Sequence, residues 1–255
     1  MAIIQLDVNQ EKIGVLTINR PEARNALNWE AMEEFTRKVE EAYAADLKVL
    51  IVTGTGAAFA AGGDLKELHN NPNTSGLRLA TTMGDALARL DAMPNPTIAA
   101  VNGFARGGGA EIAMACDVRI MSETADIGFV HTRLGLAPGW GGAQRLMRAV
   151  GYSHALELLA TGRVVKAQEA LVLRMVNWVV PPDQVVKAAY LLAKKIAAQP
   201  QEAVRAAKRM LHFTLPDTER EVRMAERAEF PPLWESDEHT GALNKYLEDK
   251  HIALE

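Results

Sequence analysis

The chain has 255 residues, of which 48% are hydrophobic and 24% are charged, as in an ordinary globular protein with a substantial core. Its 28 basic and 32 acidic residues are interleaved and leave a formal charge of −4, which argues against nucleic acid or an anionic membrane surface as a partner. A single cysteine, Cys116, excludes an intrachain disulfide. The N-terminus lacks signal-peptide features, and no apolar run reaches the roughly 20 residues that span a bilayer, so we expect a cytoplasmic protein.

The N-terminal segments alternate between strand and helix patterns. Period-two alternation over residues 3–8 and 13–19, with a turn between them, predicts a β-hairpin. Helical spacing of apolar residues predicts a helix over 29–44, with Asn28 as its N-cap. The continuous apolar run 49–52 predicts a buried parallel strand. The pattern then predicts a polar loop at 69–75, a helix at 77–90, a strand at 97–101, a helix from Gly108, a strand at 118–121 and a short apolar piece at 127–130.

From about residue 141 the pattern becomes mostly helical, with one short strand expected within 175–180. The predicted helices cover 141–150, 153–160, 166–173, 182–198, 201–213, 218–230 and 237–246. Strands alternating with helices indicate α/β crossover units. We therefore expect an α/β core over 1–195 and a C-terminal helical region over 196–255, with no flexible linker between them.

Two glycine-rich turns carry the strongest chemical signal. Residues 102–111 read Asn-Gly-Phe-Ala-Arg-Gly-Gly-Gly-Ala-Glu and lead into an apolar run, which predicts a tight turn entering a buried helix. The unpaired N–H groups at such a helix start suit a carbonyl oxygen that becomes negative during a reaction. Residues 59–64 form a second small-residue turn of this kind. Glu111 has apolar neighbours in the sequence, which makes it a candidate general acid or base beside this oxyanion hole.

The order and spacing of these turns, together with segments 19–27 and 138–146, resemble the enoyl-CoA hydratase/isomerase (crotonase) superfamily along essentially the whole chain. The resemblance implies an α/β crotonase (ClpP-like) fold with a core of repeated ββα units. It implies C-terminal helices that build a homotrimer, commonly stacked into a homohexamer. It also implies an acyl-CoA thioester as substrate, with coenzyme A as part of the substrate and no separate cofactor.

The resemblance also assigns roles to residues of this chain. It implies that the backbone N–H groups of Gly63 and Gly108 form the oxyanion hole, and that Glu111 is the first of the two catalytic glutamates of hydratases. We expect five residues to bind the substrate, namely Ala26, Ala61, Asp64, Leu65 and Trp140. No metal is expected, because the histidines show no metal-ligand spacing with carboxylates or Cys116.

One position departs from the hydratase pattern. Hydratases of this family carry a second glutamate in the segment that here spans 126–135, and His131 occupies its place. A histidine can donate and accept a proton, but it changes the charge and geometry of the site. This departure speaks against efficient hydration and makes His131 a second candidate catalytic residue.

His131 and the Pro-Gly-Trp-Gly-Gly segment 138–142 together most resemble ethylmalonyl-CoA decarboxylase-like members of the superfamily. The first expectation is therefore decarboxylation of a short alkylmalonyl-CoA, which leaves a thioester enolate for the oxyanion hole to stabilise. An ionised Glu111 fits this reaction poorly, because it would repel the substrate carboxylate. Hydration of an enoyl-CoA, isomerisation of its double bond, and a non-catalytic role as a CoA-ester binder remain as alternatives.

Overall fold

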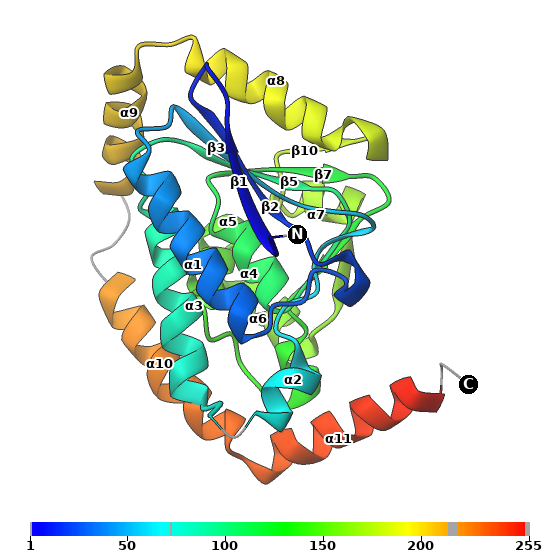
Figure 1. The fold of residues 1–255 in the computed structure, drawn as a ribbon. Helices are drawn as coiled ribbons and strands as arrows, with labels where there is room; N and C mark the ends of the chain where they lie inside the picture. Colours follow the sequence, from blue (N-terminus) through cyan, green and yellow to red (C-terminus); the bar gives the residue numbers. More distant parts are fainter. Residues whose placement is uncertain (1, 72, 214–218, 253–255) are drawn as a thin grey trace.

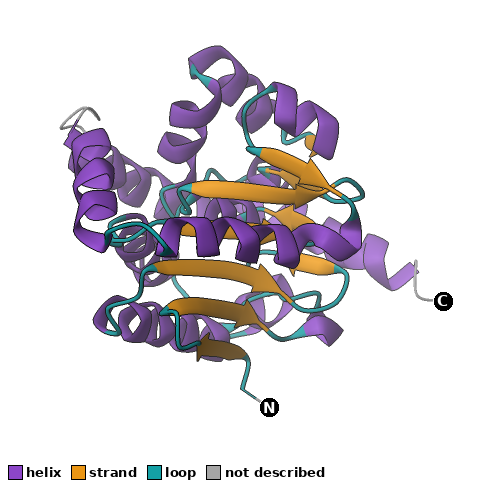
Figure 2. Cartoon of the chain, turned by 90° about the horizontal axis from the view of Figure 1, so that it is seen from above, coloured by secondary structure: helices purple, strands orange, loops and turns teal. Residues whose placement is uncertain are grey.

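The structure, a computed structural model, describes residues 2–71, 73–213 and 219–252, and their strands form two mixed sheets (Figures 1 and 2). The larger sheet has the order β1 (Ile4–Val8), β2 (Ile13–Ile18), β3 (Val49–Gly54), β5 (Thr97–Val101), β7 (Val118–Ser122) and β10 (Trp178–Val180). The smaller sheet has the order β4 (Ala58–Ala60), β6 (Phe104–Arg106), β8 (Asp126–Gly128) and β9 (Val164–Lys166). The β1–β2 and β8–β9 pairs are antiparallel, and the other pairs are parallel.

Successive strands pass from the larger sheet to the smaller one. Strands β3, β5 and β7 belong to the larger sheet, and the strands that follow them, β4, β6 and β8, belong to the smaller. A short helix comes after each pair: α2 (Leu65–Asn70), α4 (Gly108–Met114) and the 3-10 helix η2 (Val130–Leu134). The repeated strand–strand–helix unit expected from the sequence is therefore present. It brings the segments after β4, β6 and β8 to neighbouring positions, because these three strands are adjacent and parallel.

The larger sheet is buried on both faces, which explains its continuous apolar runs. Val49 and Ile51 of β3 belong to an apolar cluster with residues of α8 (Val185–Ala197). Leu50 and Val52 point the opposite way, into a larger cluster that contains Phe35 of α1 (Trp29–Ala44). Helix α8 lies across one face of the sheet, and α1 lies on the other side (Figures 1 and 2).

The C-terminal helices pack back onto the core. Helix α10 (Glu219–Trp234) runs along α3 (Gly76–Asp91), and α11 (Asp237–Ile252) contacts η2 (Figure 1). Among the described residues, no helix is both long and apolar enough to cross a bilayer. The remaining helices are α5 (Gly142–Val150), α6 (Tyr152–Thr161), α7 (Ala167–Val172), α9 (Gln201–Phe213), and the 3-10 helices η1 (Pro21–Ala23) and η3 (Pro182–Gln184).

Most predicted elements are present, and the differences have physical causes. The hairpin and the helix 29–44 are confirmed, and the side chain of Asn28 accepts the N–H of Ala31 as an N-cap. The predicted loop 69–75 is wrong at its start, because His69 and Asn70 belong to α2. The Asp64 side chain caps that helix. Strands β4, β6 and β9 were not predicted, since three residues are too few to show a period-two pattern.

Candidate active site

The nine residues predicted for the site all line one pocket of about 970 Å³. The pocket lies where the chain leaves β4, β6 and β8, and helices α3, α10 and α11 contribute further walls. The predicted residues are Ala26, Ala61, Gly63, Asp64, Leu65, Gly108, Glu111, His131 and Trp140. The topology thus brings together five separate segments of the sequence, at residues 26, 61–65, 108–111, 131 and 140.

The two predicted oxyanion-hole donors lie in adjacent turns. Gly63 follows β4, and Gly108 is the first residue of α4, directly after β6. Neither N–H has a hydrogen-bond partner within the part of the chain that the structure describes. A β-carbon built on Gly62 would lie 3.1 Å from the nitrogen of Gly108, so the two turns are in contact. Two unpaired N–H groups in one pocket are the arrangement that a thioester oxygen requires.

Backbone hydrogen bonds hold the turn that contains Gly63. The N–H of Leu27 donates to the carbonyl of Gly62 at 2.7 Å, and the N–H of Asp64 donates to the carbonyl of Leu27 at 2.8 Å. These two bonds form a parallel bridge between Leu27 and Gly63. The direction of the Gly63 N–H is therefore set by the segment 24–27, which also brings Ala26 to the pocket.

A buried asparagine fixes that segment in turn. The side chain of Asn25 is fully buried, and its amide donates to the carbonyls of Thr55 and Ala58 at 2.9 and 2.8 Å. Its Oδ1 accepts the N–H of Arg20 at 2.9 Å. Asn25 has a φ of 56°, a left-handed conformation that asparagine tolerates better than most residues. These contacts give a structural reason for the Asn-Arg-Pro-Glu-Ala-Arg-Asn-Ala-Leu motif.

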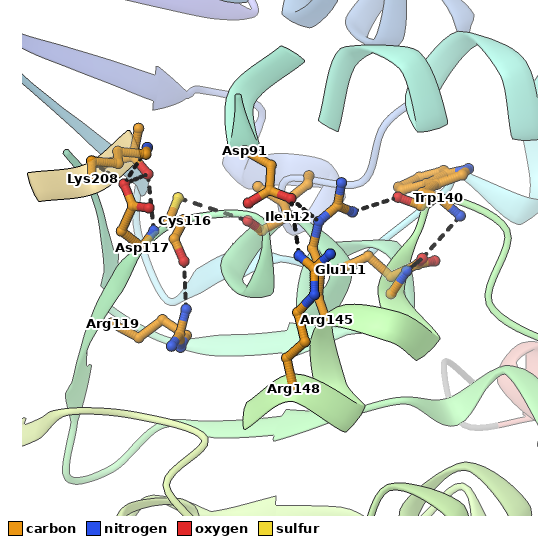
Figure 3. A network of polar contacts seen from close by, with 12 residues as sticks. Asp91, Glu111, Ile112, Cys116, Asp117, Arg119, Trp140, Arg145, Arg148 and Lys208 are labelled. Carbon is orange, nitrogen blue, oxygen red and sulfur yellow. Dashed lines mark hydrogen bonds and ion pairs between the residues drawn. The ribbon is translucent and has the colours of Figure 1, made fainter. Parts of the chain in front are cut away.

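Glu111 is the most restrained polar group of the pocket. Its side chain is 1% exposed. Its Oε2 accepts the backbone N–H of Trp140 at 2.9 Å (Figure 3). The same oxygen accepts the N–H of Gly142 at 2.8 Å, and Oε1 lies 3.0 Å from Nε2 of His131. Since a carboxylate only accepts hydrogen bonds, His131 donates through Nε2 in this arrangement. The carboxylate is therefore oriented by three donors from two other segments.

An ion pair between buried Arg145 and partly buried Asp91 fixes the loop that holds Glu111 (Figure 3). The guanidinium of Arg145 donates to the carbonyl of Trp140 at 2.8 Å, and its Nε lies 3.4 Å from a carboxylate oxygen of Asp91. The Arg145 side chain is 4% exposed. Arg148 also approaches Asp91, at 3.6 Å. Sequence reasoning did not identify this network, because its members show no motif that separates them from surface charges.

His131 lies on η2, and its side chain is nearly buried. Its second ring nitrogen, Nδ1, is buried and has no hydrogen-bond partner in the described residues. The main chain of this segment is held by the N–H of Leu136, which donates to the carbonyl of His131 at 3.1 Å. The structure therefore pairs the two predicted catalytic residues directly, with one imidazole nitrogen left unused.

The pocket has walls that the sequence did not predict. Leu79 of α3, Phe230 and Trp234 of α10, and Lys245 of α11 all line it. These residues lie far from the glycine-rich turns in the sequence, so no local motif connects them with the site. Helical spacing predicts only whether such a residue lies in the core or at the surface. The C-terminal helices thus contribute to the site of their own chain.

Other reactive groups play no visible part in this pocket. Cys116 is buried, and burial raises the pKa of its thiol to about 12, so it is not a ready nucleophile. The carboxylate of Asp117 accepts hydrogen bonds from Thr97 and Lys208 away from the pocket (Figure 3). Within residues 2–71, 73–213 and 219–252, no group of three or more His, Cys, Asp or Glu side chains is arranged to hold a metal ion.

Comparison with known proteins identifies the family. The model of the enoyl-CoA hydratase/isomerase family matches residues 8–255. The chain belongs to this family. It is 36% identical over 244 residues to a short-chain-enoyl-CoA hydratase of Clostridium acetobutylicum, covering 94% of this chain and 93% of that one. It is 40% identical over 207 residues to the 2,3-dehydroadipyl-CoA hydratase of Escherichia coli, covering 79% of each.

Solved structures of the enoyl-CoA hydratase/isomerase family share the fold. The enoyl-CoA hydratase of Bacillus anthracis superimposes with a TM-score of 0.80 at 32% identity, over 97% of both chains. The enoyl-CoA hydratase/isomerase of Pseudoalteromonas atlantica gives a TM-score of 0.86 at 27% identity, over 97% of this chain and 98% of that one. The predicted α/β crotonase fold and superfamily are confirmed. The predicted likeness to ethylmalonyl-CoA decarboxylases finds no support in these relatives, whose names are those of hydratases and isomerases.

Proposed function

We propose that the protein is a lyase that adds water to the double bond of a 2-enoyl-CoA thioester. The observation that carries the proposal is the fixed Glu111 carboxylate in the same pocket as the unpaired N–H groups of Gly63 and Gly108. The hydratase names of several relatives support the same reaction. Glu111 stays the general base in this proposal, and His131 becomes its positioning partner.

The proposed reaction uses these groups in sequence. The thioester oxygen accepts hydrogen bonds from Gly63 and Gly108. Glu111 takes a proton from water as the water oxygen bonds to C3, and the electron pair of the double bond moves onto the thioester oxygen. The enolate then takes that proton from Glu111 at C2, so that one water molecule is added overall. Each hole donor contributes roughly 3–4 kcal/mol to such transition states, and the general base about 10²–10⁴-fold in rate.

Decarboxylation of an alkylmalonyl-CoA is the second candidate, and His131 is the observation that favours it. An imidazole with a buried, unpartnered Nδ1 offers a polar contact that a second glutamate would not. The arrangement of Glu111 weighs against this candidate. Its carboxylate group contacts His131, Trp140 and Gly142, and in the ionised form that the general base requires it would repel a negatively charged carboxylate on the substrate.

One experiment separates the candidates. The purified protein is offered crotonyl-CoA, ethylmalonyl-CoA and methylmalonyl-CoA in parallel, and the products are followed by mass spectrometry. We expect crotonyl-CoA to gain the mass of one water and the Glu111→Gln variant to lose this activity. Formation of butyryl- or propionyl-CoA with crotonyl-CoA untouched would overturn the proposal in favour of decarboxylation. Tight binding of all three esters without turnover would indicate a CoA-ester binder.

We also propose that the chain assembles as a homotrimer or homohexamer. The resemblance implies trimer contacts on the C-terminal helices, and exposed apolar side chains on α5 and α6 support a further interface there, namely Met147, Tyr152 and Leu156. Large apolar groups at the surface are typical of sites where another protein binds. Light scattering coupled to size-exclusion chromatography tests the proposal, with Tyr152→Glu expected to release smaller species. A monomer at micromolar concentration would contradict it.

A further inference from the structure

The indole of Trp140 lies directly against the proposed oxyanion hole. The residue is 6% exposed. A β-carbon built on Gly108 would come within 2.0 Å of ring atom Cζ3, 2.4 Å of Cη2 and 2.7 Å of Cε3. The six-membered part of the indole therefore covers the Cα of the residue whose N–H is meant to hold the thioester oxygen. Glycine at position 108 is required by this contact.

Neighbouring groups hold Trp140 in place. Its N–H donates to Glu111 at 2.9 Å, and its carbonyl accepts from Arg145 at 2.8 Å. On the residue before it, a β-carbon built on Gly139 would lie 2.7 Å from the ring of Phe230. A close-packed ring cannot move aside without displacing its neighbours. The main chain of Trp140 is therefore held in place, and its ring is almost fully buried against Gly108.

Beside its charged groups, the pocket has several apolar lining residues. Leu79, Leu136, Phe230 and Trp234 line the same pocket as Trp140. An acyl chain whose thioester oxygen is held at Gly108 begins beside the indole. Apolar walls suit a hydrocarbon chain, and a large fixed ring at its starting point limits how far the chain can extend.

We propose that Trp140 sets the acyl-chain length of the substrate and restricts it to short chains, such as butyryl or hexanoyl groups. The inference rests on the proposed function only in requiring that a CoA ester binds with its oxygen at Gly63 and Gly108. Replacing the indole by a small side chain opens the wall and admits longer chains. One methylene more or less on a substrate in a hydrophobic pocket changes selectivity by roughly 10–200-fold. The change in chain-length preference on replacing Trp140 is therefore large enough to measure.

The test measures binding and turnover separately. Dissociation constants of saturated butyryl-, hexanoyl-, octanoyl- and dodecanoyl-CoA are determined by calorimetry for the wild type, Trp140→Ala and Trp140→Leu. Trp178→Ala is the matched control, because Trp178 is 47% exposed and does not line the pocket. We expect the wild type and the control to bind butyryl-CoA best. We expect the affinity for octanoyl-CoA relative to butyryl-CoA to rise by about tenfold or more in folded Trp140 variants.

The possible outcomes separate this inference from the proposed function. Unchanged chain-length preference in a folded Trp140→Leu variant, judged by circular dichroism, would overturn the role of Trp140. Preference of the wild type for dodecanoyl-CoA would overturn it as well. Failure of every CoA ester to bind the wild type would instead reject the proposed function. The hydration rates of the matching 2-enoyl-CoA series are expected to follow the same order as the binding constants.

Discussion

Oxygen Oε2 of Glu111 lies so close to Gly142 that a β-carbon built on this glycine would come within 2.5 Å of it. The same oxygen accepts the N–H of Gly142 at 2.8 Å. The glycine therefore provides both the donor and the space for the carboxylate. In the proposed reaction Glu111 is the base. Its carboxylate can occupy this position only because residue 142 has no side chain.

Gly142→Ala should displace the Glu111 carboxylate while leaving the helix that begins at residue 142 intact. We expect kcat for crotonyl-CoA to fall about 10²-fold, because a misplacement of about 1 Å has an effect of this size. The affinity for butyryl-CoA should change little. Gly241→Ala is the control, since a β-carbon there has no atom within 4 Å. Equal kcat values for both variants would argue against Glu111 as the base.

His131→Ala should remove most of the activity and leave CoA-ester binding intact. The imidazole donates to Glu111 at 3.0 Å, and without it Oε1 of the carboxylate loses this hydrogen bond. Steady-state kinetics with crotonyl-CoA, together with calorimetric binding of butyryl-CoA, would separate the two effects. Unchanged turnover would show that His131 takes no part in the reaction.

Asp91→Ala should lower the stability of the whole domain. The Arg145 guanidinium would stay buried without its carboxylate partner, and removing one member of a buried ion pair costs about 3–5 kcal/mol. Chemical denaturation would measure the change in the free energy of unfolding. Glu33→Ala removes an exposed partner of Arg78 and should cost at most about 1 kcal/mol. Similar losses in both variants would mean that Asp91 is not effectively buried.

The stability of the protein should depend on pH through His239. Burial lowers the pKa of this histidine from 6.5, against the opposing effect of the Leu134 carbonyl, which accepts its Nδ1–H at 2.7 Å. The neighbouring His69 lowers it further. As the pH falls through 6.5, the unfolded chain takes up a proton at this residue that the folded chain does not, so the folded state loses stability.

The His239→Gln variant tests this dependence. Its free energy of unfolding should change less than that of the wild type between about pH 7.5 and 5.5. Urea denaturation at several pH values in this range gives both curves. Parallel curves for the two proteins would show that another group is responsible.

The sequence predicted the parts of the site that local motifs encode. The glycine-rich turns were visible because tight turns before helices need glycine and leave N–H groups unpaired, and the family resemblance then singled out Gly63 and Gly108. The partners of Glu111 were not found. Trp140 and Gly142 reach its carboxylate through backbone groups from 29 and 31 residues away, and a backbone donor leaves no signature in the residue type.

The C-terminal helices show a second limit of sequence reasoning. The predicted helix 218–230 actually continues through Pro231 and Pro232 to Trp234. A β-carbon built on Gly76 of α3 would lie 2.5 Å from the Cα of Pro231. Helices α3 and α10 are therefore closely packed where α10 extends beyond its predicted end. Local propensity disfavours proline inside a helix, and tertiary contacts override that preference here.

The proposed oxyanion-hole donors belong to the main chain, and this has a consequence for protein engineering. Only proline would remove the backbone N–H of Gly63 or Gly108, whereas the proposed proton-transfer groups at 111 and 131 are side chains that any substitution changes. A mutant library at these two positions would keep the two N–H groups proposed to bind the thioester oxygen. It would vary only the side chains that transfer protons to or from the enolate. Selection for new reactions in this scaffold can therefore begin from positions 111 and 131, with replacements at 111 also required to hold the N–H groups of Trp140 and Gly142.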